Sequence, residues 1–281
     1  MATHALTRLL ARSLAREVPL PALRALDRLR GAPWPYCIVA FHRVGDGGAD
    51  ELTYPAAGFA ALCRYWRDHY EILSLDCLLA RLAHSDEAPH PCLTITFDDG
   101  YADNAEVAAP ILDRLNLSAT FFVTTAVIGT RARFAWDAGL PATPPLMSWA
   151  QVRELRAAGF GIGSHTATHA RLAGLRGAEL HYELVASRQR LQMELGEPVL
   201  DFAYPFGGPH DCDAPAREAV RRAGYRCCLA CHGGGVAATD SPYRLRRISV
   251  SPRHHANPQA WARTYTRLRW GAARSEGRGH G

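Results

Sequence analysis

The sequence predicts an α/β protein whose strands form a closed or nearly closed (β/α) barrel. Apolar, strand-like runs alternate with helical patterns over about 215 residues, an order that is typical of parallel sheets. Some of these runs, such as residues 36–41, are apolar throughout, as expected for a strand covered on both faces. The length of 281 residues is sufficient for one substantial core. An open, doubly wound sheet is the alternative architecture.

The individual elements follow from local patterns along the chain. Apolar and β-branched residues between turn signals predict strands at residues 36–41, 71–73, 93–97, 119–123, 160–163, 199–203, 225–229 and 243–250. Helical spacing of apolar residues predicts helices at residues 59–70, 75–82, 104–115, 149–158, 178–195 and 214–223. Ser148 and Gln151 predict a capping box at the start of the helix 149–158. The helix 178–195 is expected to end at Gly196, before Pro198.

The basic residues are concentrated at the two ends of the chain. The net charge is +5, and the sequence contains arginine but no lysine. Residues 1–33 predict an amphipathic helical segment, because leucine and arginine recur there at helical spacing. We expect this segment to pack on the barrel, and peripheral membrane contact through residues 1–30 is the alternative. Residues 253–281 form an Arg-rich tail, either a helix on the barrel or disordered. The modest charge, without an aromatic-basic ladder, indicates no nucleic-acid partner.

Cysteine usage and the absence of a leader pattern predict a cytoplasmic protein, either free or at the inner membrane face. No apolar run of secretory type follows the basic start, and several of the eight cysteines lie in apolar runs, as unpaired thiols do. Cys228, Cys231 and His232 could form a metal knuckle, but no second pair of ligands stands nearby. We therefore expect free thiols.

Two carboxylates end the predicted strand at residues 93–97. Asp98 and Asp99 precede Gly100, and in parallel α/β folds the site lies beyond the carboxyl ends of the strands. This position indicates site chemistry. The alternative is that Asp98 occupies a turn and that Asp99 caps the following helix.

A pair of histidines follows the predicted strand at residues 160–163. His165 and His169 are four residues apart, so they share one face of a helical turn. Together with a carboxylate from the other strand end they would supply two nitrogens and one oxygen, which leaves a position open for water. This arrangement predicts a metal site, whereas an isolated pair would be a helix cap and a surface histidine.

Residues 34–250 resemble the polysaccharide deacetylases of the NodB-homology type, carbohydrate esterase family 4. The segment 96–100 resembles the first motif of that family, and the segment 165–169 resembles its second motif, H-[ST]-x-x-H. The resemblance implies a deformed (β/α) barrel over residues 34–252, with short helical appendages at both ends. It also implies a divalent ion, zinc or else cobalt, nickel or iron, held by Asp99, His165 and His169. Asp98 would then be the base that activates a metal-bound water.

The third motif of the family is altered in this chain. Ala203 stands where the family has an arginine, and Phe206 stands where it has an aromatic residue. By this match the backbone N–H of Phe206 would stabilise the oxyanion. We expect Arg247, on the last predicted strand, to replace the missing arginine beside Asp98. The alternative is that Arg247 is a surface residue.

The fifth motif of the family places a histidine on the last strand, and this chain has none there. His42 ends the first predicted strand, which neighbours the last strand in a closed barrel. His42 is therefore the candidate general acid, and the segment 41–44 resembles a subgroup of deacetylases whose acid comes from the N-terminal side. The alternative is a buried, hydrogen-bonded histidine. The other candidates are His210, His232, His254 and His255.

The resemblance predicts a metal-dependent hydrolase that removes N-acetyl groups from amino sugars. The expected partner is an N-acetylated glycan or a lipid-linked sugar precursor. The long loop at residues 124–147 predicts a rim or lid, from which Phe134 and Trp136, with Trp149 beyond, could stack on a sugar or seal the barrel. Because the third and fifth motifs are altered, the alternative is a catalytically impaired protein that binds metal or glycan. A phosphatase-like hydrolase is disfavoured, because its two carboxylates need an intervening residue and the chain has no lysine.

Overall fold

The computed structural model describes residues 35–46, 50–211 and 213–272. The predicted amphipathic segment at residues 1–33 lies outside these residues. No helix within the described ranges is long and apolar enough to cross a membrane.

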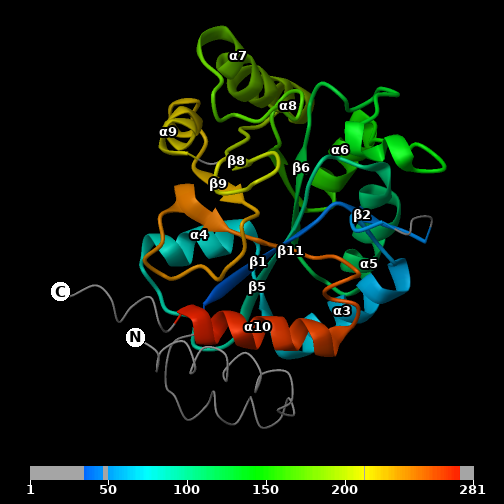
Figure 1. Ribbon diagram of the computed structural model, residues 1–281, viewed down its shortest axis with the longest axis vertical. Helices are drawn as coiled ribbons and strands as arrows, with labels where there is room; N and C mark the ends of the chain where they lie inside the picture. The colour runs from blue at the N-terminus through cyan, green and yellow to red at the C-terminus, as the bar shows by residue number, and fades with distance from the viewer. Residues whose placement is uncertain (1–34, 47–49, 212, 273–281) are drawn as a thin grey trace, which may run out of the picture.

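A parallel sheet curves into a nearly closed barrel at the centre of the molecule (Figure 1). The strands follow one another around the barrel in the order β10-β9-β8-β7-β6-β5-β1-β11, and every neighbouring pair is parallel. The strands are β1 (Tyr36–Phe41), β5 (Cys92–Phe97), β6 (Ala119–Val123), β7 (Gly161–Ser164), β8 (Asp201–Ala203), β9 (Cys227–Ala230), β10 (Leu245–Arg246) and β11 (Ile248–Ser249). Strand β4 (Glu71–Ile72) also pairs with β5, and β2 (Arg43–Val44) pairs with β3 (Thr53–Tyr54). The predicted deformed (β/α) barrel is confirmed.

The last predicted strand, residues 243–250, is not continuous. A short 3-10 helix, η4 (Pro242–Arg244), leads into β10, and β11 follows after one residue, Arg247. Strand β10 pairs with β9, whereas β11 pairs with β1 at the other edge of the sheet. The segment therefore bridges the two edges, and the ladder breaks at Arg247, where it changes partner. The backbone N–H of Arg247 donates to the carbonyl of Ala230 at 2.8 Å.

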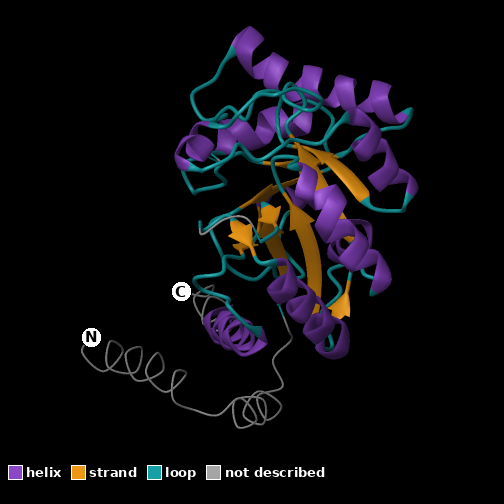
Figure 2. Cartoon of the chain, turned by 90° about the vertical axis from the view of Figure 1, so that its right-hand side faces the viewer, coloured by secondary structure: helices purple, strands orange, loops and turns teal. Residues whose placement is uncertain are grey.

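Helices surround the barrel on its outer side, as the two views in Figures 1 and 2 show. Both predicted helix signals are present, since Ser148 and Gln151 form the capping box and Gly196 ends its helix in the left-handed conformation. The predicted helices at residues 104–115 and 178–195 each contain one π-helical turn, η1 and η3. The helices are α3 (Ala56–His69), α4 (Leu75–Ala83), η1 (Asn104–Ala108), α5 (Ala109–Arg114), η2 (Ala135–Gly139), α6 (Trp149–Ala157), α7 (Gly177–His181), η3 (Tyr182–Ala186), α8 (Ser187–Leu195), α9 (Ala214–Arg222) and α10 (Pro258–Ala272).

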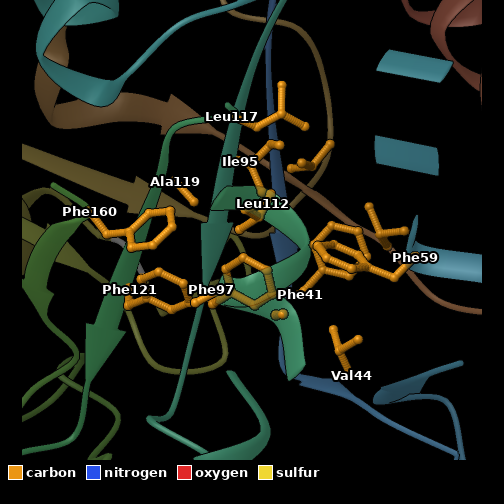
Figure 3. Close-up of a cluster of buried hydrophobic side chains, with 14 of the residues drawn as sticks. Phe41, Val44, Phe59, Ile95, Phe97, Leu112, Leu117, Ala119, Phe121 and Phe160 are labelled. Atoms are coloured by element: carbon orange, nitrogen blue, oxygen red, sulfur yellow. The ribbon is translucent and has the colours of Figure 1, made fainter. Parts of the chain in front are cut away.

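An aromatic cluster fills the space between the sheet and helix α3. The rings of Phe97 and Phe121 stack at 4.8 Å, and Phe41 stacks on Phe97 at 5.5 Å (Figure 3). Helix α10 adds Trp261, whose ring lies 5.2 Å from that of Trp66 on α3. Residues within the predicted Arg-rich tail thus contribute to the core. Cysteines in the described part of the chain are free thiols, most of them buried.

Candidate active site

The carboxyl ends of the barrel strands surround a cavity of about 410 Å³. Six of the seven site residues predicted from the sequence line this cavity, and Arg247 lies behind one of them, in contact with Asp98. Segments far apart in the sequence meet there because parallel strands place their carboxyl ends at the same edge. The lining residues are His42, Leu52, Asp98, Asp99, Trp136, His165, His169, Tyr204, Phe206, Cys231 and Ser249.

Asp99, His165 and His169 form a buried group of potential metal ligands. The Oδ1 atom of Asp99 lies 3.4 Å from Nε2 of His165 and 3.2 Å from Nε2 of His169. Both carboxylate oxygens of Asp99 are buried without a hydrogen-bond partner, although buried polar atoms ordinarily have one. The Nδ1 atom of His165 donates to the carbonyl of Ala203 at 2.8 Å, which directs its Nε2 towards the same space. These donors fit a divalent cation.

The charge and backbone of Asp99 also suit a ligand. Burial alone would raise the pKa of its carboxyl, but the side chains of His165 and His169 outweigh burial and hold the pKa well below its usual value. Asp99 is therefore ionised. Its φ angle is +74°, and that of His169 is +65°, both in the left-handed region that non-glycine residues rarely adopt. Backbone strain of this kind is common at functional sites.

Asp98 forms a buried ion pair with Arg247. The guanidinium binds both carboxylate oxygens, with N···O distances of 2.8 and 2.7 Å, and it also donates to the hydroxyl of Thr96 at 3.0 Å. Burial raises the pKa of Asp98, but the positive charge of Arg247 and the neighbouring His165 outweigh it and lower the pKa. Arg247 is fully buried, so it is not a surface residue.

His42 follows β1 and faces the cavity together with Asp98 and Asp99. Its backbone carbonyl accepts a hydrogen bond from Nδ2 of Asn104 at 2.8 Å. Burial lowers the pKa of His42 more than the two carboxylates raise it. The pairing of β1 with both β5 and β11 explains how His42 and Arg247 reach the same site.

Phe206 lies at the mouth of the cavity with a φ angle of +62°. Half of its surface is exposed, its ring lies 4.9 Å from that of His169, and the guanidinium of Arg171 covers it at 4.8 Å. The tight turn after it requires glycine, because a Cβ on Gly207 would lie 2.4 Å from the backbone nitrogen of Cys231.

Trp136 is the aromatic side chain that the long loop contributes to the cavity. Its ring stacks on Phe134 at 4.6 Å and lies 4.7 Å from the ring of His169. Its Nε1 donates to the hydroxyl of Tyr101 at 3.0 Å, and that hydroxyl donates to Asp137 at 2.8 Å. Trp149, by contrast, does not line the cavity.

The sequence does not indicate that several other residues of this region contact one another. Asp137 forms an ion pair with Arg43, which lies on β2 and also binds Asp50 at 2.8 Å. Arg43, Tyr101 and Asp137 are distant in the sequence, and no spacing rule connects them. The position of Tyr101, directly after the carboxylate motif, is the one local hint.

The other candidates from the sequence lie elsewhere. The histidines His210, His232, His254 and His255 do not line the cavity. Cys228 and Cys231 belong to no group of potential metal ligands among the described residues. A second such group, Glu71 with His90 and Cys92, is exposed in part, and its carboxylate already binds Arg81. A cation there would have to displace the guanidinium.

The fold and this site together define a (β/α)-barrel protein with a candidate hydrolytic centre at the carboxyl end of its strands. The family model described as "Polysaccharide deacetylase" matches residues 85–228, more than half of the chain. The chain therefore belongs to the polysaccharide deacetylase family, which supports carbohydrate deacetylation as its activity.

Individual relatives agree with this assignment. The protein YxkH of Bacillus subtilis (strain 168), which carries the name of a polysaccharide deacetylase, is 26% identical over 216 residues, covering 76% of this chain and 71% of its own. The deacetylase PplD of Streptococcus pyogenes, solved with acetate, is 22% identical with a TM-score of 0.68, covering 83% of this chain and 99% of its own. IcaB from Ammonifex degensii is 23% identical with a TM-score of 0.70, and the match covers 82% of this chain and 97% of IcaB. At these identities the two structures show the fold.

Proposed function

We propose that this chain is a metal-dependent hydrolase that removes N-acetyl groups from the amino sugars of a polysaccharide or glycan precursor. One observation carries the proposal: the unpartnered carboxylate of Asp99 faces two imidazoles, directly beside an Asp98 that Arg247 holds in place. Membership of the deacetylase family supports the acyl chemistry.

Asp99, His165 and His169 would hold the ion. Two imidazole nitrogens and one carboxylate oxygen suit zinc, and cobalt or nickel would also fit. A divalent cation bound there would polarise the carbonyl of the substrate amide and lower the pKa of water towards neutrality.

Asp98 would accept the proton of the attacking water. Its lowered pKa keeps it ionised at neutral pH, so that it can act as a base. The two hydrogen bonds from Arg247 fix the plane of the carboxylate, which the family achieves with an arginine where this chain has Ala203. The same bonds stabilise the anion and so make it a weaker base. In this respect Arg247 favours orientation over basicity.

His42 would donate a proton to the departing nitrogen, since an amine leaves poorly without one. It is a histidine in the same cavity as Asp98, which supports this role. The backbone N–H of Phe206 would donate to the oxyanion that develops on the amide oxygen. The left-handed backbone of Phe206 belongs to the turn that carries this N–H at the mouth of the cavity.

The substrate would enter between Trp136, Phe206 and Leu52, which line the cavity beside the candidate metal ligands. Exposed aromatic rings favour the apolar face of a sugar. An N-acetylated glycan or a lipid-linked sugar precursor is the partner that we propose. The cytoplasmic location, and membrane contact through residues 1–30, remain predictions.

The proposal is tested by elemental analysis together with acetate release. We expect purified protein to contain about one zinc, cobalt or nickel ion per chain. It should release acetate from at least one member of a panel of N-acetylated saccharides and lipid-linked precursors. Removal of the ion with a chelator should abolish release, and adding it back should restore release. Bound metal without acetate from any substrate would instead support the catalytically impaired alternative, and acetate release unaffected by chelation would contradict the metal role.

A further inference from the structure

Glu183 contacts the loop that carries the two histidines, although it is not itself a candidate ligand. It lies on the π-helical turn η3 and is only 5% exposed. Its Oε2 atom accepts hydrogen bonds from the backbone N–H groups of Ala167 at 3.0 Å and Thr168 at 2.9 Å. Its Oε1 atom accepts a third, from the hydroxyl of Thr168, at 2.6 Å. One buried carboxylate thus holds the two residues just before His169.

The loop needs such support because its backbone is strained. Thr166 and His169 have φ angles of +66° and +65°, which cost free energy in residues other than glycine. One hydrogen bond inside the loop, from the N–H of His169 to the hydroxyl of Thr166 at 3.0 Å, does not involve Glu183. Contacts from outside the loop must therefore oppose its relaxation.

The two histidines differ in how they are anchored. His165 has its own anchors, since its N–H donates to Val123 at 2.9 Å and its Nδ1 donates to Ala203 at 2.8 Å. The Nδ1 atom of His169 is buried without a hydrogen-bond partner. The direction of the His169 ring therefore depends on the loop backbone and on the aromatic rings around it.

The π-helical turn lies between α7 and α8, where Glu183 faces the loop. A π turn widens a helix locally, and such turns are frequent at functional sites. The hydroxyl of Ser187, one turn further on, donates to the carbonyl of Glu183 at 2.7 Å and fixes the turn. The π-helical turn η1 also directs a side chain towards a segment of the site, since Asn104 on it donates to the backbone carbonyl of His42.

We propose that Glu183 is the positioning residue of the second histidine: its carboxylate holds residues 167 and 168 so that the imidazole of His169 faces Asp99. The proposal rests on the metal site of the proposed function. It adds a residue that binds neither metal nor substrate and acts through the loop.

The test compares metal affinity in Glu183→Gln with that of the wild-type chain. The amide oxygen can still accept from the two backbone N–H groups, and the amide nitrogen can donate to the hydroxyl of Thr168, but the negative charge that strengthens the hydrogen bonds is lost. We expect affinity for Zn²⁺ and Co²⁺ to fall about 10- to 100-fold, the usual effect of losing a residue that orients a ligand. The absorption spectrum of bound Co²⁺ should also change, because His169 moves relative to Asp99. Glu179→Gln, an exposed carboxylate on α7, is the matched control and should change neither.

A second variant tests the proposal if Glu183→Gln does not fold. Thr168→Val removes only the hydroxyl bond and leaves both backbone bonds, so we expect about fivefold weaker Co²⁺ binding. Wild-type affinity and an unchanged cobalt spectrum in folded Glu183→Gln, or in Thr168→Val if the former does not fold, would overturn the proposal. Acetate release is measured separately. A wild-type chain that binds Co²⁺ but releases no acetate would contradict the proposed function, while the loss of affinity in the variants would still support the role of Glu183.

Discussion

The floor and the rim of the cavity are built in different ways. The floor consists of Asp98, Asp99, His165 and Arg247, none more than 2% exposed and all at or beside strand ends. The rim consists of Trp136, in the short 3-10 helix η2, and Phe206, in the turn after β8, which are 37% and 51% exposed. Hydrogen-bonded strands hold the floor in place, whereas the rim depends on side-chain contacts. We infer that the floor determines the reaction and the rim selects the substrate.

The rim is nevertheless supported from below. Trp136 binds Tyr101, Tyr101 binds Asp137, and Asp137 pairs with Arg43 on β2. Tyr101, Asp137 and Arg43 are buried and include an ion pair, so they restrict the tryptophan more than an ordinary loop would. Backbone ladders therefore hold the floor, and a side-chain network holds the rim.

The largest expected effects come from the floor. His165→Ala should lose both metal and activity, because it removes a ligand. Asp98→Asn should keep its metal and lose turnover by about 10³-fold or more, because the amide cannot accept a proton. Metal content and acetate release measure the two outcomes, with Asp113→Asn on the exposed face of α5 as the control. Normal metal content and activity in His165→Ala would refute the division of roles within the floor.

Replacement of His42 should have the next largest effect. His42→Ala should lower the rate about 10²- to 10⁴-fold and abolish the alkaline limb of its pH profile. Because burial lowers the pKa of His42, the wild-type limb should begin at a lower pH than for an ordinary histidine. The profile is measured on both proteins, with exposed His84→Ala as the control. If the alkaline limb persists in His42→Ala, the acid is another group.

The Asp98–Arg247 pair links the floor to stability. Arg247→Met leaves a buried carboxylate unpaired, so the free energy of unfolding should fall by about 3–5 kcal/mol. The pKa of Asp98 is lowered in the folded protein, so its contribution is present above the unfolded pKa and is lost as the pH falls through the folded pKa. Without Arg247 that pKa rises, and the acid limb of activity should move to higher pH.

Urea unfolding measures the change in the free energy of unfolding of Arg247→Met, and a profile of rate against pH measures the shift of the acid limb. The control is the neighbouring Arg246→Met, whose partly exposed pair with Asp240 should contribute at most about 1 kcal/mol. Equal losses in the two variants would mean that the buried pair does not stabilise the floor.

The smallest effect is expected at the rim. Trp136→Leu should raise KM for the glycan about tenfold with little change in kcat, since it removes the ring that would stack on the sugar and its hydrogen bond to Tyr101 but no proposed catalytic group. Tyr101→Phe, which removes the hydrogen bond to Trp136, should change KM in the same direction by less. Trp149→Phe, outside the cavity, is the matched control. A fall in kcat with unchanged KM in Trp136→Leu would show that the rim takes part in the reaction itself and that floor and rim do not differ in function.

Sequence reasoning predicted the part of the site that short segments contain. Asp98 with Asp99, and His165 with His169, lie within a few residues of each other at strand ends, so the local pattern suffices for them. The expected helical turn is wrong, because residues 165–169 form a loop in which Thr166 and His169 have positive φ angles. His42 was predicted through the expected closure of the barrel, which the pairing of β11 with β1 confirms. Arg247 was predicted as the replacement for the arginine missing from the third motif, and it does bind Asp98. Their catalytic roles stay predictions. Glu183, Asp137 and Arg43 were missed, because an isolated charged residue on a helix or loop gives no sign of what it faces.

The amino-acid sequence by itself determined the alternation of strands and helices, the strand ends that carry carboxylates and imidazoles, and the family. These properties depend on hydrophobic periodicity and on neighbours along the chain. Tertiary structure alone decided that the last strand divides at Arg247, that Glu183 holds the histidine loop, and that Trp136 rather than Trp149 reaches the cavity. Each of these depends on contacts between distant segments, which exist only once the barrel has closed.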